Sequence, residues 1–127
     1  MWKYRCYDDG EGEPNLWKRW YDATSDVQGS HDSVFEGLET MVNWREPWTK
    51  FFDKKARIIE VRLSGDVEWR VFGFHSGARQ EFVVLSVGYH KGKVYTPRDI
   101  RETLIKRKKE IEADPRKAVP CARPTIP

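Results

Sequence analysis

The sequence predicts one α+β domain built on a small, antiparallel-dominated sheet of about four strands. Three observations on the 127-residue chain predict this class. Apolar and basic residues alternate at the start, two stretches with helical spacing follow, and three β-signals then occur without a long helix between them. With a charged helix at the end, the expected element order is β-α-α-β-β-β-α.

The first predicted elements are a short strand and a short helix. Trp2, Tyr4 and Cys6 alternate with basic residues, which indicates a strand that ends at the turn-rich residues 8–12. Asn15 is a suitable N-cap for the helix. Behind it, apolar residues recur at helical spacing: Leu16, Trp17, Trp20 and Tyr21. This spacing predicts an amphipathic helix.

The second helix has the clearest periodicity in the chain. Its apolar residues follow the spacing of a core-facing helix: Val34, Phe35, Leu38, Met41 and Val42. We expect this helix to end near Trp44. Glu46 precedes Pro47, and a residue before proline avoids the helical region.

The next three β-signals predict a meander. In residues 57–63 apolar side chains alternate with charged ones, and residues 64–66 have turn chemistry. Residues 69–75 form the expected return strand. Residues 81–87 are apolar on both faces, as expected of a covered central strand.

A charged helix and a proline-rich tail complete the chain. Thr96 and Pro97 have the chemistry of a helix start, and the helix is expected to run to about Ala113. Its basic run at residues 106–109 predicts a peripheral, mostly solvated helix. The domain is therefore expected to span 1–114. Four prolines in residues 115–127 disfavour a regular element and predict a tail.

Charge is distributed unevenly along the chain. Residues 1–52 carry six Lys and Arg against ten Asp and Glu, a balance of −4, whereas residues 53–127 carry 17 against 10, a balance of +7. A basic part of this kind favours a polyanionic partner, because neutralised phosphates release counterions. A solvated charged helix accounts equally well for the same composition, so both readings remain open at this point.

Composition also argues against several classes of protein. No apolar run approaches the ~20 residues that a membrane helix needs, and the N-terminus lacks the apolar stretch of a secretory signal. Cys6 and Cys121 have no spacing from which a local disulfide framework or a zinc site could be built. We therefore expect a cytoplasmic protein in a reducing compartment, with no membrane partner, no metal and no cofactor.

Four short motifs carry a family resemblance over residues 57–112. They are Glu60-Val61-Arg62, Trp69-Arg70-Val71-Phe72, the segment from Val84 to Lys91, and Tyr95-Thr96-Pro97. In this order and spacing they resemble the RelE/ParE/HigB toxin superfamily, and most of all its phage-derived, HigB-like branch. The first 50 residues are similar to the family only in element order.

The resemblance implies a RelE-like toxin fold and a bacterial type II toxin, encoded beside a helix-turn-helix antitoxin with which it would form an oligomer. Such a toxin is an endoribonuclease that cleaves mRNA on the ribosome without a metal. The ParE branch shares the fold but inhibits DNA gyrase and cleaves nothing. A decayed phage-derived protein would only bind nucleic acid or its antitoxin. Fold alone does not decide among these functions.

Three residues are candidates for catalysis. Arg70 lies inside a predicted strand, where an unpaired charge is costly, so we expect either a substrate phosphate or a carboxylate, Glu60 or Glu68, beside it. His90 ends the central strand, and histidine transfers protons near neutral pH, although a lone histidine is more often structural. The resemblance places Tyr95 near the cleaved phosphate. Packing under the last helix is the alternative for Tyr95.

Four further cations are candidates for binding RNA: Arg57, Arg62, Lys91 and Lys93. Each of them could instead be an ordinary solvating charge. Between residues 57 and 98 no dense carboxylate cluster could hold Mg²⁺, which disfavours a metal nuclease. Of the six tryptophans, only Trp48 is a candidate for stacking on a base, since it follows Pro47 in a predicted loop. The family concentrates basic residues on the strand that matches residues 57–63 and often has a pair of lysines where Gly92 stands. Glu60 and Gly92 interrupt these basic runs, so the resemblance predicts a weaker catalyst than a typical member of the family.

Overall fold

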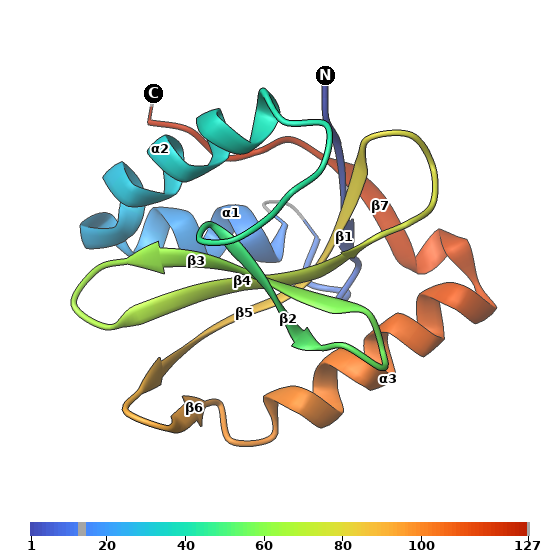
Figure 1. Ribbon diagram of the computed structural model, residues 1–127. Coiled ribbons are helices and arrows are strands. Elements are labelled where there is room, and N and C mark those ends of the chain that lie inside the picture. Colours follow the sequence, from blue (N-terminus) through green and yellow to red (C-terminus); the bar gives the residue numbers. More distant parts are fainter. Residues whose placement is uncertain (13–14, 127) are drawn as a thin grey trace.

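The computed structural model describes residues 1–12 and 15–126. Its sheet is the middle of three layers: helices α1 (Leu16–Ala23) and α2 (Gln28–Glu39) lie on one face, and α3 (Ile100–Ala113) lies on the other (Figure 1). Two short 3₁₀ helices precede α2 and the last strand. Within the described part of the chain, no helix is both long and apolar enough to cross a membrane.

Seven strands of the described residues form one mixed sheet. Its order is β2-β3-β4-β5-β1-β7, and β6 pairs with the end of β5. β1 pairs in parallel with β5, and the other described pairs are antiparallel. The strands are β1 (Lys3–Tyr7), β2 (Thr49–Asp53), β3 (Ile58–Ser64), β4 (Glu68–His75), β5 (Glu81–Lys91), β6 (Val94–Thr96) and β7 (Ala118–Cys121).

This sheet corrects the expected fold, a RelE-like toxin fold with about four antiparallel-dominated strands. The α+β class holds, and the predicted strand, two helices, meander and final helix are present. β2, β6 and β7 are additional strands of three to five residues. Strands this short carry too few residues to produce a recognisable period-two pattern.

The C-terminal segment is the second correction. The expected tail contains β7, which pairs antiparallel with β1 at the edge of the sheet. Pro120 is tolerated there, because an edge strand can leave one side of its backbone unpaired. Cys121 forms a disulfide with Cys6, with 5.9 Å between the two Cα atoms. The cysteines are 115 positions apart, so an examination of local spacing could not find the pair.

Helix α2 is shorter than its apolar periodicity predicts. It ends at Glu39, and Val42, predicted to face the core, is 74% exposed. Trp44 still packs against the core beyond the helix end, and its Nε1 donates a hydrogen bond to the carbonyl oxygen of Leu38 at 3.1 Å. The indole therefore covers the last turn of α2 from the loop.

Helix α3 is less solvated than its charge suggests. It begins at Ile100 rather than at Pro97, because Thr96 pairs with Tyr89 in the β5–β6 hairpin. Within the basic run, Arg107 is half-buried, and its Nη1 donates to the carbonyl oxygen of Leu85 at 2.8 Å. One of the predicted surface charges thus ties the helix to the sheet.

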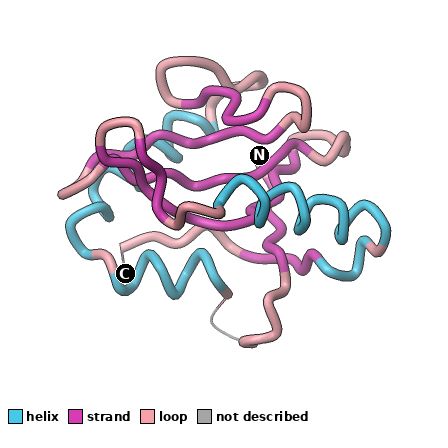
Figure 2. Tube along the Cα trace, turned by 90° about the horizontal axis from the view of Figure 1, so that it is seen from below, coloured by secondary structure: helices cyan, strands magenta, loops and turns pink. Residues whose placement is uncertain are grey.

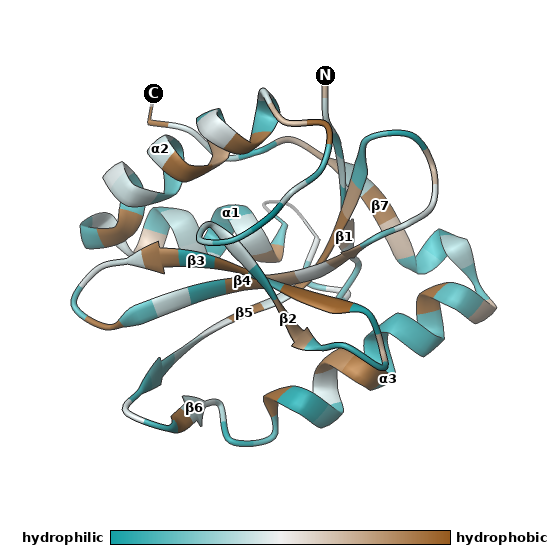
Figure 3. Ribbon diagram, in the orientation of Figure 1, coloured by the Kyte–Doolittle hydropathy of each residue, from teal (hydrophilic) through white to brown (hydrophobic). Residues whose placement is uncertain are grey.

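Two hydrophobic clusters fill the layers on either side of the sheet. The cluster under α1 and α2 includes Trp17, Phe35 and Val61, and the cluster under α3 includes Phe72 and Leu104. Figure 3 shows hydrophobic residues along the central strands, whereas much of α3 is hydrophilic. Seen from below in Figure 2, α3 runs along only part of its face of the sheet. The hairpin that ends in β6 lies beyond the start of this helix (Figure 1).

Candidate functional site

Three adjacent strands place a group of charged side chains on the α3 face of the sheet. Alternate residues of a strand share a face. Ile58 and Phe72 belong to the cluster under α3, so Glu60 on β3 and Arg70 on β4 project from that same face. His90 on β5 lies opposite Glu68, two residues from Arg70. The strand pairing therefore brings together residues that are far apart in the sequence.

Arg70 is the centre of this group. Its side chain is almost fully buried, and its Nε donates to Oε2 of Glu60 at 2.6 Å. Nη1 donates to the carbonyl oxygen of Trp69 and Nη2 to Nε2 of His90, both at 2.8 Å. Glu68 is more distant, with 3.9 Å between Oε1 and Nη2. Of the two partners expected for Arg70, a substrate phosphate or a carboxylate, the structure contains the carboxylate, which is Glu60.

The guanidinium group has hydrogen-bonding capacity left. Arginine carries five N–H donors, and three of those in Arg70 are used by Glu60, Trp69 and His90. One N–H on each terminal nitrogen therefore has no hydrogen-bond partner among the described residues. Arg70 is also one of the residues that line a surface cleft.

Glu60 links the arginine to the predicted tyrosine. Its side chain is 8% exposed, and its Oε1 accepts a hydrogen bond from the Tyr95 hydroxyl at 3.1 Å. Burial, and then the negative charge of Glu60, raise the pKa of Tyr95 to about 12. Tyr95 is therefore protonated at neutral pH and can donate a proton or hydrogen bond.

His90 is held as one neutral tautomer. Because arginine only donates, Nε2 of His90 must accept from Arg70, and the ring proton then lies on Nδ1. Nδ1 is 3.0 Å from the carbonyl oxygen of Gly92 and 3.2 Å from Oε2 of Glu68. The ring also lies against Tyr95, with 5.1 Å between centroids. The structure thus unites the three predicted catalytic residues in one network.

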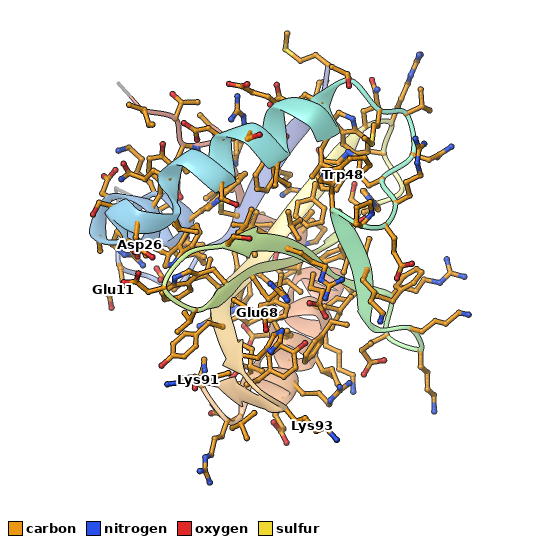
Figure 4. The ribbon with its side chains drawn as sticks, turned by 60° about the vertical axis from the view of Figure 1, so that its left-hand side comes forward. Glu11, Asp26, Trp48, Glu68, Lys91 and Lys93 are labelled. Atoms are coloured by element: carbon orange, nitrogen blue, oxygen red, sulfur yellow. A yellow bond between two sulfur atoms is a disulfide. The ribbon has the colours of Figure 1, made fainter. Side chains whose placement is uncertain are left out.

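The predicted RNA-binding cations are distributed over a wider area. Arg62 is half-buried next to Arg70, and its side chain has no partner among the described residues. Lys91 and Lys93 are exposed on the β5–β6 hairpin, where Gly92 adopts a φ of +62°. In Figure 4 Glu68 lies between Trp48 and these two lysines.

Arg57 lies apart from the other cations. It is exposed and precedes the first residue of β3. Four residues of β3, each about 3.3 Å long in an extended chain, lie between it and Arg62. Arg57 is therefore at the opposite end of β3 from Arg62 and the cleft.

A cleft of about 330 Å³ opens beside the network. Its lining comes from α2, from the loop before β2, and from the ends of β3 and β4: Ser30, Val34, Pro47, Trp48, Arg62, Leu63, Ser64, Glu68 and Arg70. The described residues contain no cluster of three or more His, Cys, Asp or Glu side chains that could hold a metal.

Sequence reasoning did not place Glu60 and Glu68 among the candidate site residues. In the structure Glu60 joins Arg70 to Tyr95, and Glu68 contacts His90 and lines the cleft. The signal was available in part, since a carboxylate on the same or the neighbouring strand is the usual partner of a buried arginine. Which of the two carboxylates would bind depended on strand register.

Comparison with known proteins finds no family model, no curated protein and no solved structure that matches this chain. The function must therefore be argued from the side chains of the site alone. A buried cation, a neutral imidazole and a protonated phenol lie within one hydrogen-bonded network beside a cleft.

Proposed function

We propose that this protein is the toxin of a type II toxin–antitoxin pair and that it cleaves mRNA without a metal ion. The motifs of residues 57–112 suggest this activity. The main support from the geometry is Arg70, which is held by Glu60, contacts His90 and is one of the residues that line the cleft. A fixed cation of this kind suits a phosphate that gains negative charge during cleavage.

Cleavage begins when a phosphate of the RNA binds Arg70. A phosphate oxygen competes with Nε2 of His90 for the guanidinium, because both accept from the same group. Once released, Nε2 takes the proton of the 2′-hydroxyl as a general base. O2′ then bonds to phosphorus and the P–O5′ bond breaks. The products are a 2′,3′-cyclic phosphate and a 5′-hydroxyl.

Tyr95 acts as the general acid for the leaving group in this scheme. Its raised pKa keeps the hydroxyl protonated, so it can donate its proton to the departing O5′. Glu60 acts as a positioning residue, since it orients both the guanidinium and the phenol. Arg62, Lys91 and Lys93 supply the electrostatic attraction for neighbouring phosphates.

The partners of the proposed toxin are ribosome-bound mRNA and a helix-turn-helix antitoxin that holds it in an inactive oligomer. Its compartment is the bacterial cytoplasm. There, the reducing thiol pools keep most cysteines as thiols, so the Cys6–Cys121 bond is expected only after oxidation.

The test is RNA cleavage by the purified protein in the presence of EDTA. We expect fragments with 2′,3′-cyclic phosphate ends, and a loss of at least about 100-fold in rate for His90→Gln, within the range for removal of a general base. His75→Gln is the matched control, because this histidine lies on β4 outside the network. Intact RNA together with inhibition of gyrase supercoiling would replace the nuclease by the ParE-like alternative.

A further inference from the structure

The cleft beside Arg70 owes its shape to the point where β2 begins. β2 pairs with β3 only from Thr49, opposite Val61. The backbone N–H of Arg62 donates to the carbonyl oxygen of Trp48 at 2.8 Å, which fixes the loop before β2 against the edge of β3. Beyond Arg62 no described strand pairs with β3 on this side. The backbone N–H of Ser64 donates instead to Oγ of Ser30 on α2 at 2.9 Å, and the cleft is lined by both of these serines.

Trp48 forms one wall of the cleft. Its side chain is half-buried and packs against the core cluster under α2, while it also lines the opening. A tryptophan supported from behind and accessible from a cleft is a suitable platform for a flat aromatic ligand. Stacking of a nucleic-acid base on an aromatic side chain is worth a measurable part of the affinity of single-stranded RNA.

The polar groups of the cleft supply both a donor and an acceptor. Arg62 has no side-chain partner among the described residues, and Glu68 is 60% exposed with only its contacts to His90 and Arg70. A guanidinium binds the O6 and N7 acceptors of guanine in a bidentate manner. A carboxylate accepts from two adjacent N–H donors, and guanine is the base that presents such a pair, at N1 and N2.

Arg70 connects the cleft to the reaction site. It lines the cleft and also contacts Glu60 and His90. We propose that the cleft binds an unpaired guanine base, stacked on Trp48 and read by Arg62 and Glu68, so that the phosphate of this nucleotide reaches Arg70. This inference rests on the proposed RNA substrate and adds the base that the enzyme selects.

The direct test measures binding of GMP, AMP, CMP and UMP by calorimetry. We expect GMP to bind best, and Trp48→Ala to weaken its binding by about fivefold or more, the lower end of base–aromatic stacking. Trp48→Phe keeps an aromatic ring and retains most of the affinity. Phe51→Ala, at an exposed aromatic residue of β2 outside the cleft, is the control that leaves binding unchanged.

Two further variants test recognition of the hydrogen-bonding edge of the base, and both keep Trp48 intact. Arg62→Ala and Glu68→Gln should each reduce the preference for GMP over AMP, since each removes one partner of the guanine edge. Equal binding of all four nucleotides by the wild type, or a preference that survives both substitutions, would overturn the proposal.

Cleavage patterns separate failure of the inference from failure of the proposed function. If RNA is cut and Trp48→Ala leaves the positions of the cuts unchanged, the nuclease stands and the guanine site is wrong. If RNA stays intact but GMP binding depends on Trp48, the guanine site stands and the nuclease is wrong.

Discussion

At the scale of single residues, Arg70 carries both stability and the proposed chemistry. Its charge is buried against Glu60, so each ion depends on the other for compensation. Arg70→Ala is therefore expected to lower the stability of the fold as well as the activity. Loss of activity in this variant alone would not separate a chemical role from a structural one.

We expect Arg70→Ala to lower the free energy of unfolding by about 3–5 kcal/mol, because it leaves Glu60 buried without a cation. Urea denaturation measures the change. Arg79→Ala, at an exposed arginine of the β4–β5 turn, should stay within about 0.5 kcal/mol of the wild type. An Arg70→Ala variant as stable as that control would mean that water reaches Glu60.

His31 predicts a pH dependence of stability. Burial lowers its pKa to about 4, against the ordinary value of 6.5, and its Nε2 accepts a hydrogen bond from Nε1 of Trp17. Between pH 6.5 and 4 His31 is protonated in the unfolded chain but stays neutral in the folded chain. The free energy of unfolding should therefore decrease as the pH is lowered from 6.5 to 4. His31 contributes at most about 1.4 kcal/mol to this decrease for each pH unit.

Urea denaturation at several pH values between 7 and 4 tests this expectation. Asp32 and His75 also have lowered pKa values and contribute in the same direction, so the comparison needs a variant that lacks only the imidazole of His31. His31→Gln should be less stable at pH 7 but should show a shallower decline. Parallel declines in the two proteins would exclude His31 as the source.

At the scale of elements, β7 and its disulfide secure the C-terminal segment. The disulfide closes a loop of 115 positions, and cross-links of long loops restrict the unfolded chain most. We expect Cys121→Ser to lose about 2–4 kcal/mol in the free energy of unfolding of the oxidised protein. Denaturation with and without dithiothreitol measures this. After treatment with an oxidant, identical curves or an intact mass that still corresponds to two thiols would contradict the disulfide.

Helix α3 offers two exposed lysines to the proposed antitoxin. Arg107 binds the carbonyl oxygen of Leu85 and Lys108 contacts Glu112, whereas Lys106 and Lys109 are exposed. Charge reversal of Lys106 and Lys109 to Glu should weaken antitoxin binding and flatten its dependence on salt, since exposed charges are screened.

Reversal of Arg45, in the loop before β2, and of Lys50, on β2, changes the net charge equally and serves as the control, because both side chains are exposed and neither lies on α3. Unchanged affinity and salt dependence in the α3 variant would mean that the antitoxin binds elsewhere.

At the scale of the whole molecule, the proposed function predicts growth arrest. Induction of the protein alone in a bacterial host should stop translation quickly while DNA supercoiling stays normal. His90→Gln should remove this toxicity, because it removes the proposed general base. Unlike Arg70→Ala, it does not leave Glu60 buried without its cation. Early loss of supercoiling or DNA breaks would favour the ParE-like alternative instead.

Local patterns predicted much of the fold. The Asn15 cap, the meander from β3 to β5 and the body of α3 were confirmed, since each depends on contacts within a few residues or on one regular period. The candidate residues Arg70, His90 and Tyr95 were also chosen from short motifs. Their grouping in one network agrees with that choice but does not test their roles.

The sequence by itself determined the α+β class and the two helices before the meander, and it supplied the candidate residues Arg70, His90 and Tyr95. Only the tertiary structure decided that β2, β6 and β7 join the sheet, that Cys6 meets Cys121, and that Glu60 rather than Glu68 pairs with Arg70. Short edge strands and buried ion pairs are stabilised by neighbours distant in the chain. Their free energy comes from register and packing, which leave no period in the sequence.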